Sequence, residues 1–280
     1  MESPLSKHVD KVTRYYQRNT GKFLRFGEND GYPAIHIALW PEGTASVAEA
    51  LSVAHRLIAE AIQAHGEPVH RVADLGCGMG AALVYMADHL GPNVALEGLT
   101  IGTPPPMLKD HSESGRIRIQ EGDFHQADAF LPPCSAAYCI EAMAHSGDVN
   151  AFMRAASKVL EAGGRLIVID DFVESEDPPS RVLQTYRAHW LVPGVRPLKE
   201  VERLAMAHGL RLESNQDLTP WIRLGRPRDR LIRWTRPLWA WLCRFSDYAK
   251  SLSGGDARQR CLESGQTRFR MLQFVKSGDS

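Results

Sequence analysis

The sequence has no net charge, no long apolar run and no paired-cysteine motif. Its 33 Lys and Arg residues balance its 33 Asp and Glu residues, so no overall field steers it toward nucleic acid or an anionic membrane. No apolar run approaches the ~20 residues that a membrane-spanning helix needs. The five cysteines form no C-x-x-C pair, which argues against a structural zinc site. The first residues lack the apolar core of a secretory signal. We therefore expect a cytoplasmic protein with no metal, no nucleic-acid partner and no membrane span.

The composition is that of an ordinary globular protein. Apolar residues make up 44% and charged residues 24% of the chain, both close to the usual values. A length of 280 residues suits one large α/β domain or a core domain with an appended cap.

Short apolar runs alternate with helical patterns through the middle of the chain. Such alternation predicts a doubly wound, mostly parallel, Rossmann-like sheet. A strand in the region after residue 198 and an alternating run at 267–278 raise the expected number of strands to seven, and we expect the last to be an edge strand that can run antiparallel. The other expected strands are 69–76, 93–100, 116–123, 136–142 and 165–172, and helices are expected at 44–65, 80–91 and 148–164.

Both flanks of this core differ from it in pattern. Residues 44–65 predict an amphipathic helix that Ser46 and Glu49 begin as a capping box, so residues 1–66 are interpreted as an N-terminal helical cap. After Phe172 the periodicity is lost and prolines are frequent. We interpret residues about 173–245 as a lid inserted after the fifth strand, within a core domain of residues 67–280.

A glycine-rich loop follows the first expected strand and admits two interpretations. Gly76, Gly78 and Ala81 fit the dinucleotide pattern G-x-G-x-x-[GA], and Glu97 lies about 20 residues further on, where a ribose is bound in that class. An NAD(P)- or flavin-dependent oxidoreductase is therefore one candidate. Asp74, two residues before the first glycine, favours another, because its carboxylate would repel a pyrophosphate but can pair with a ligand ammonium.

A second pair of residues, at the end of the third strand, also favours a ligand without phosphate. Asp123 is placed to accept a hydrogen bond from the amino group of an adenine, and Phe124 to pack on the ring. No second mononucleotide-binding half is evident after the fifth strand.

Four motifs in this order resemble those of class I S-adenosylmethionine (SAM)-dependent methyltransferases. They are D-L-G-C-G-M-G (74–80), G-L-T (98–100), E-G-D-F (121–124) and L-E-A-G-G-R-L-I-V-I-D (160–170). The resemblance spans about residues 67–175 and is strongest to enzymes that methylate tocopherols, sterols and prenyl diphosphates at carbon. Thr100 stands where most members carry an acidic residue for the ribose hydroxyls. The resemblance implies SAM as cofactor, with the binding residues Asp74, Gly76, Gly78, Gly80, Thr100, Ile101, Asp123, Phe124 and Tyr16.

The stretch after the fourth strand supplies the candidate catalytic residues. Glu141 and His145 match an acidic-then-histidine pattern of the same C-methyltransferases, and in a helix their spacing would place them on one face. His145 is then a candidate base, and Glu141 would orient it, contact the sulfonium of the cofactor or stabilise a carbocation formed by alkene methylation. The alternative is that Glu141 only lines the cofactor pocket and His145 only caps a helix. Asp170 and Asp171 form a second candidate acid pair, with surface solvation of one of them as the alternative.

Aromatic residues before the core offer further candidates. Tyr15, Tyr16 and His36 are candidates for lining the site, or the two tyrosines only anchor a cap helix.

Residues 221–245 have the most unusual composition, with seven arginines and four tryptophans. Three interpretations of this segment remain open. It is a nucleic-acid-binding surface, a site where arginines bind an anionic acceptor such as a prenyl diphosphate, or an amphipathic lid helix with solvated arginines and inward tryptophans.

The sequence therefore predicts a methyltransferase of small-molecule biosynthesis that acts on a bulky, largely hydrophobic acceptor. An anionic group on the acceptor remains an option. We expect methylation at carbon, with O- or N-methylation as the alternative, and a homo-oligomer remains open.

Overall fold

A seven-stranded mixed sheet forms the centre of the computed structural model, which describes residues 4–26, 32–64, 66–102, 115–174, 180–235, 243 and 246–278. The strand order is β3-β2-β1-β4-β5-β7-β6, with β1 to β5 parallel and β7 antiparallel to both of its neighbours. This confirms the predicted Rossmann-like fold. The strands are β1 (Arg71–Leu75), β2 (Ala95–Thr100), β3 (Ile117–Glu121), β4 (Cys134–Ile140), β5 (Leu160–Val173), β6 (Leu210–Asp217) and β7 (Thr267–Lys276).

The last strand has the predicted direction but not the predicted position. β7 lies between β5 and β6 and pairs with both, so the expectation of an edge strand was wrong. The edge is β6, where buried and solvent-facing positions alternate along the strand. Alternation reports which face of a strand is covered, but it carries no information on whether a neighbour lies on each side.

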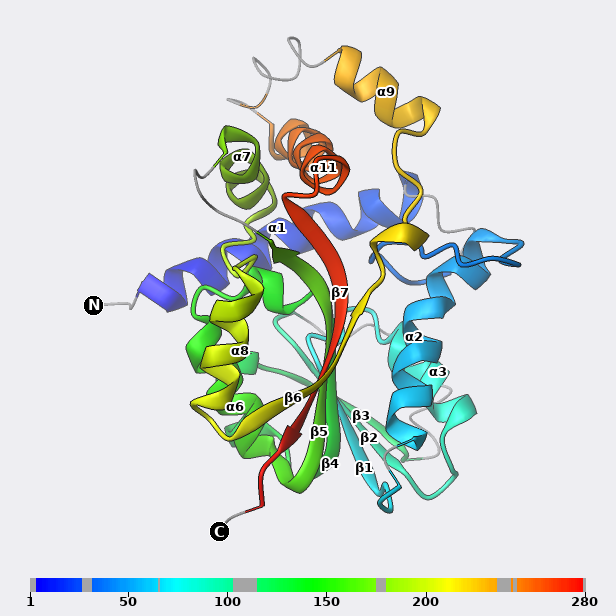
Figure 1. Ribbon diagram of the computed structural model, residues 1–280, viewed down its shortest axis with the longest axis vertical. Coiled ribbons are helices and arrows are strands. Elements are labelled where there is room, and N and C mark those ends of the chain that lie inside the picture. Colours follow the sequence, from blue (N-terminus) through cyan, green and yellow to red (C-terminus); the bar gives the residue numbers. More distant parts are fainter. Residues whose placement is uncertain are drawn as a thin grey trace.

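Helices cover both faces of the sheet (Figure 1). On one face, α2 (Val47–Gln63) and α3 (Ala81–His89) share an apolar core with the strands. On the other, α6 (Val149–Val159) and α8 (Leu198–Met206) do the same. Ser46 caps α2 as predicted, since its hydroxyl accepts from the Glu49 amide at 3.1 Å. The two layers bury both faces of the sheet.

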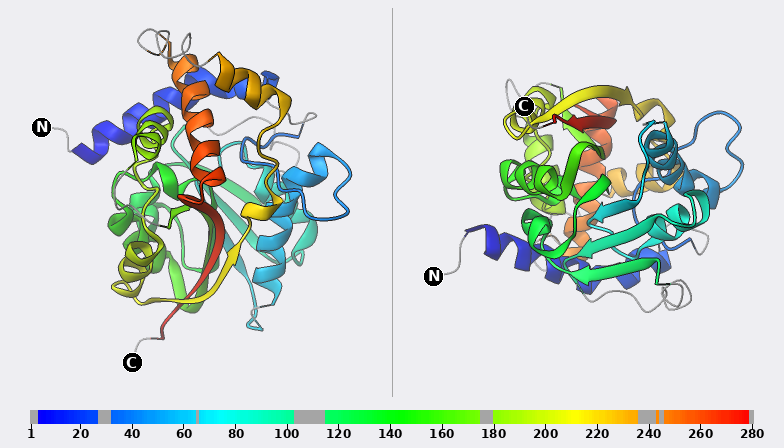
Figure 2. Two further views of the ribbon diagram at one scale, coloured as in Figure 1. Left: turned by 45° about the horizontal axis from the view of Figure 1, so that its top comes forward. Right: turned by 90° about the horizontal axis from the view of Figure 1, so that it is seen from below.

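Four further helices gather beyond the carboxyl ends of the parallel strands, and Figure 2 shows the group from two other directions. They are α1 (Pro4–Phe26), α7 (Arg181–Trp190), α9 (Pro227–Trp234) and α11 (Asp247–Glu263). Since α2 packs on the sheet face, it is α1 that lies across this edge within residues 1–66. Ligands of open α/β sheets bind at the carboxyl ends of the strands, so these helices lie over the expected site. The division into a cap, a core and a lid stays a prediction.

Candidate active site

Backbone hydrogen bonds and positive φ angles determine the shape of the glycine loop between β1 and α3. The amides of Gly76 and Cys77 both donate to the Leu99 carbonyl at 2.9 Å, which ties the loop to the end of β2. Gly76, Gly78 and Gly80 have φ angles of 102°, 50° and 76°, a region that disfavours any residue with a Cβ. A Cβ on Gly76 would also lie 2.6 Å from the Cβ of Ala142. The loop therefore presents bare backbone at the carboxyl edge of the sheet.

The other predicted cofactor residues follow the neighbouring strands. Thr100 and Ile101 lie at the end of β2, and the Thr100 carbonyl accepts from the Gly122 amide at 2.8 Å. Phe124 is buried and meets Phe152 edge to face, with 5.2 Å between ring centroids. The structure thus brings these residues and the glycine loop to one edge, while adenine stacking on Phe124 stays a prediction.

Asp123 is held by a histidine that sequence reasoning overlooked. One oxygen, Oδ1, accepts from the His125 backbone amide at 3.0 Å and from its Nδ1 at 2.6 Å. Burial raises the pKa of Asp123, but the bonds from His125 outweigh it and leave the pKa below its ordinary value. His125 is fixed in turn by Ser146, 2.8 Å from its Nε2. Asp123 is thus an oriented carboxylate whose second oxygen carries no bond to His125.

Two acidic residues near the loop have different surroundings. Asp74 is only 3% exposed, and burial raises its pKa to about 7, an effect that the Tyr138 hydroxyl partly offsets. Glu97 pairs with Ala73 inside the sheet, three positions before the end of β2, and its Oε1 lies 3.9 Å from Arg71 Nε. Glu97 is therefore away from the carboxyl edge, which removes the ribose contact of the dinucleotide interpretation.

Glu141 follows β4 directly, in a backbone conformation that the sequence did not predict. Its φ is 49°, and the next turn is the short 3₁₀ helix η3 (Met143–His145). The condition under which Glu141 and His145 would share one face, an α-helix across both residues, is therefore not met. The Glu141 carboxylate accepts from the Ile37 amide at 3.1 Å and from Arg258 at 3.0 Å.

His145 is a neutral imidazole bonded on both nitrogens. Nδ1 lies 3.0 Å from the Leu191 carbonyl, and because a carbonyl only accepts, Nδ1 carries the proton. Nε2 then accepts from the Tyr16 hydroxyl at 2.7 Å. Burial lowers the pKa of His145 to about 4 despite the nearby Glu141. His8 of α1 also bonds the His145 carbonyl, at 2.9 Å. The alternative role of His145 as a mere helix cap fails, because Asp148 caps α6.

The second candidate acid pair is buried. Asp170 and Asp171 are each 1% exposed, so the surface alternative was wrong. Asp171 accepts from Arg258 Nε and from the Tyr186 hydroxyl, both at 2.6 Å. Asp170 accepts from the amides of Ala144 and Asp171, both at 2.8 Å. Burial raises the pKa of both carboxyls, and Arg258 limits the rise at Asp171.

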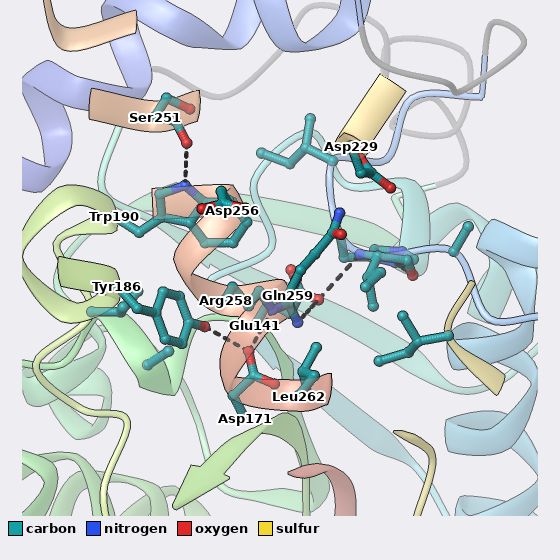
Figure 3. Close-up of a pocket in the computed structure, with 18 of the residues that line it drawn as sticks. Glu141, Asp171, Tyr186, Trp190, Asp229, Ser251, Asp256, Arg258, Gln259 and Leu262 are labelled. Carbon is teal, nitrogen blue, oxygen red and sulfur yellow. Dashed lines mark hydrogen bonds and ion pairs between the residues drawn. The ribbon is translucent and has the colours of Figure 1, made fainter. Parts of the chain in front are cut away.

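Arg258 is a residue of the candidate site that sequence reasoning missed. It lies on α11, 117 residues after Glu141, and bridges Glu141 to Asp171 (Figure 3). One signal was available, the Gly254-Gly255 pair within a helical segment. A Cβ on Gly254 would lie 2.2 Å from the Trp190 ring, so this glycine lets α11 approach α7 closely enough to place Arg258 in the site.

These side chains line a cavity of about 350 Å³ beneath α1, α7, α9 and α11. Apolar and aromatic groups form most of its wall, and the Tyr16–His145 pair and the carboxylates form its polar part. The glycine loop and Asp123 do not line it, but Ala142 touches the loop while its neighbour Glu141 faces the cavity. The cavity therefore adjoins the cofactor edge. Other lining residues include Tyr15, His36, Trp40, Asp170, Asp171, Tyr186, Trp190, Arg223 and Arg258.

The arginine-rich segment lies partly in this wall. Arg223, Arg226 and Arg228 line the cavity, whereas Trp234 is 81% exposed, so the expectation of inward tryptophans was wrong for Trp234. Residues 236–242, 244 and 245 lie outside the described residues. Within the described part of the chain, no group of three or more His, Cys, Asp or Glu residues could hold a metal ion. Among the described helices, none has the length and apolar character to cross a membrane.

Comparison with known proteins agrees with this geometry. Residues 73–168 match the methyltransferase domain family. An O-methyltransferase of Aspergillus nomiae is 26% identical over 66% of this chain and 83% of its own. A rice 24-methylenesterol C-methyltransferase is 27% identical over 64% of this chain and 53% of its own. The crystal structure of geranyl diphosphate C-methyltransferase from Streptomyces coelicolor, in complex with Mg²⁺, geranyl diphosphate and S-adenosylhomocysteine (SAH), superposes with a TM-score of 0.71 at 18% identity, covering 98% of this chain and 100% of that one.

The fold and the family match together define a SAM-dependent methyltransferase, and the oxidoreductase interpretation is set aside. The residues present fit the cofactor, since the bare glycine loop, the oriented Asp123 and the buried Asp74 share one edge of the sheet. The chain is similar in sequence and in fold to SAM-dependent methyltransferases.

Proposed function

We propose that this methyltransferase acts on carbon in a small, bulky and largely apolar acceptor. The observation that carries the proposal is the cavity of about 350 Å³, whose mostly apolar and aromatic wall surrounds a few convergent polar groups. Such a wall favours a hydrophobic metabolite. All five cysteines are free, which supports the expected reducing, cytoplasmic location.

The chain's own residues have defined parts in this reaction. SAM, when bound, supplies an electrophilic methyl group and keeps the electron pair of the broken carbon–sulfur bond on its sulfur. Asp74, Thr100, Ile101, Asp123, Phe124 and the glycine loop would hold and orient it. Tyr16 and His145 would accept the proton that the acceptor loses, since the phenol can pass its own proton to the unprotonated Nε2.

The carboxylates give carbon methylation its physical support. Methyl addition to an alkene leaves a carbocation, and a nearby negative charge lowers the energy of that state. Glu141 and Asp171 face the cavity with Arg258 between them. Arg258 would thus hold both carboxylates in place as a positioning residue.

Oxygen methylation is the second candidate. The Tyr16–His145 pair, with 2.7 Å between the phenol oxygen and Nε2, would equally deprotonate an acceptor hydroxyl. The three O-methyltransferases among the relatives support the same chemistry.

The test is methyl transfer from SAM carrying a deuterated methyl group to matched alkene and phenol acceptors, with the product analysed by mass spectrometry and NMR. A new carbon–methyl bond supports the proposal, and transfer to the phenol alone would replace it with the second candidate. His145→Ala and Glu141→Gln should lower turnover more than SAH affinity. Unchanged turnover in both variants would remove these residues from the mechanism.

A further inference from the structure

Arg223 lies on the wall of the cavity with its guanidinium stacked on an aromatic ring. It follows the short helix η4 (Thr219–Trp221), and its Cζ lies 3.4 Å from the centroid of the Trp40 ring. The Trp40 amide donates to the Trp221 carbonyl at 2.7 Å, which fixes the two segments to each other. Stacking uses the face of a guanidinium and leaves its N–H edge directed outward. Arg223 is therefore a pre-oriented donor.

Arg223 differs from Arg226 and Arg258 because these two arginines have acidic partners. Arg258 is paired with Asp171 and Glu141, and Arg226 is paired with Asp229 at 3.0 Å. Arg223 itself has neither a hydrogen bond nor an ion pair within the described part of the chain, and its side chain is exposed. An exposed, stacked and unpaired guanidinium in a ligand cavity is suited to bind an anion in bidentate fashion.

The charges that line the cavity differ in burial and in pairing. Glu141 and Asp171 share Arg258, and Asp170 is buried beside them. Two further lining carboxylates are each paired with an arginine, Asp229 with Arg226 and Asp256 with Arg233, whereas Arg223 is exposed and has no acidic partner within the described part of the chain. An acceptor with one anionic end would be repelled from the carboxylates and attracted to Arg223. Its apolar remainder would then point toward the reacting groups.

We propose that Arg223, held on Trp40, binds a carboxylate or phosphate at the outer end of the methyl acceptor and thereby selects amphiphilic acceptors with an anionic group. This inference rests on the proposed function, since it takes the cavity as the acceptor site. It assigns the orientation of the acceptor as well as its class.

The test compares three probes with the same ten-carbon chain, namely decanoate, decyl phosphate and decan-1-ol. Binding to the full chain saturated with SAH is measured by calorimetry. We expect both anions to bind at least about tenfold more tightly than the alcohol, because charge-assisted bidentate bonds are the strong ones. Decanoate and decyl phosphate separate a carboxylate site from a phosphate site by their relative affinities. Equal binding of all three probes would overturn the proposal.

Two arginine variants separate a local bond from a general effect of charge. Arg223→Gln should abolish the preference for anions and leave decan-1-ol affinity within about twofold. Arg230→Gln is the matched control, because Arg230 is exposed on α9 and does not line the cavity. It removes the same charge and should keep the preference. An equal loss in both variants would overturn the proposal in favour of a diffuse field.

Two further measurements distinguish a failure of the proposed role of Arg223 from a failure of folding or of the methyltransferase function. Trp40→Leu should weaken anion binding although Arg223 keeps its charge. If stacking on Trp40 did not orient Arg223, this variant would leave anion binding unchanged. Thermal melting with SAH reports the cofactor site separately. Loss of SAH binding in the wild type would contradict the methyltransferase function, whereas normal SAH binding without anion preference contradicts only the role of Arg223.

Discussion

The cofactor edge and the acceptor cavity meet at Glu141 and Ala142, yet they are built in different ways. The cofactor edge consists of peptide groups and glycines held by the sheet, with the Gly76 and Cys77 amides bonded to Leu99. The cavity consists of side chains bonded to one another across separate helices, such as Arg258 with Glu141. Backbone groups hold a constant ligand, while side chains on covering helices can change with the acceptor. Under the proposed function, the first half would bind the cofactor and the second would select the acceptor.

The largest expected effect comes from the side-chain half. Arg258→Met leaves the buried Asp171 and the partly buried Glu141 without their cation, which should cost about 3–5 kcal/mol of unfolding free energy. Denaturant unfolding measures it. Arg260→Met on the same helix is the control and should cost less than about 1 kcal/mol. Similar losses in both variants would mean that the network does not hold the cavity together.

A second variant separates chemistry from binding within the cavity. Tyr16→Phe removes the hydroxyl that lies 2.7 Å from His145 Nε2. Turnover should fall about 100-fold, the usual lower range for a lost acid–base group, while the Kd for SAH stays within about twofold. Tyr85→Phe, outside the cavity, should change neither. A weaker Kd with normal turnover would place Tyr16 in the cofactor half instead.

A third pair of variants tests the backbone half. Gly76→Ala would place a Cβ 2.6 Å from that of Ala142, whereas a Cβ on Gly78 meets nothing within 4 Å. Both positions have positive φ, but the 50° of Gly78 lies in the left-handed region that other residues can enter, whereas the 102° of Gly76 lies outside it. Gly76→Ala therefore adds backbone strain to the steric clash. Gly76→Ala should raise the Kd for SAH at least about tenfold, equivalent to 1.4 kcal/mol, and Gly78→Ala clearly less. Calorimetry checks this, and equal effects would show that neither the clash nor the φ of 102° at Gly76 limits cofactor binding.

The smallest expected effect is a pH dependence of cofactor binding. Burial raises the pKa of Asp74 to about 7, so the carboxyl is protonated below that pH and must lose its proton to pair with the ammonium of SAH. Affinity should therefore rise as pH rises toward 7 and level off above it, by less than about tenfold per unit. Asp74→Asn should remove the dependence between pH 6 and pH 8. An equal pH dependence in this variant would place the titrating group elsewhere.

Much of the cofactor edge was predictable because it is local. The segments 74–80, 98–101 and 121–124 each follow a strand, and the carboxyl ends of parallel strands meet at one edge. His125 was missed because its bond to Asp123 depends on the exact turn after β3. The helix expected across Glu141 and His145 failed because Glu141 adopts a positive φ that no periodicity signals.

For the cavity, the sequence identified individual candidate residues but not the contacts between them. Tyr16 and His145 were both candidates, but their mutual hydrogen bond spans 129 positions. The Gly254-Gly255 pair near Arg258 indicated a close helix contact but not the partners of Arg258, and Trp40 gave no local signal, since each acquires its part through a residue distant in the chain. Trp234 was expected inside, yet its helix turns it to solvent.

By itself, the sequence determined the fold class, the cofactor and the residues that follow each strand, because these depend on short-range patterns of apolar residues, glycines and acids. Only the tertiary structure decided the place of β7 between β5 and β6, the neutral state of His145 and the pairing of Arg258 with two carboxylates. Those features depend on which distant segments exclude water from one another, and burial of that kind sets both the partner and the pKa of a polar group.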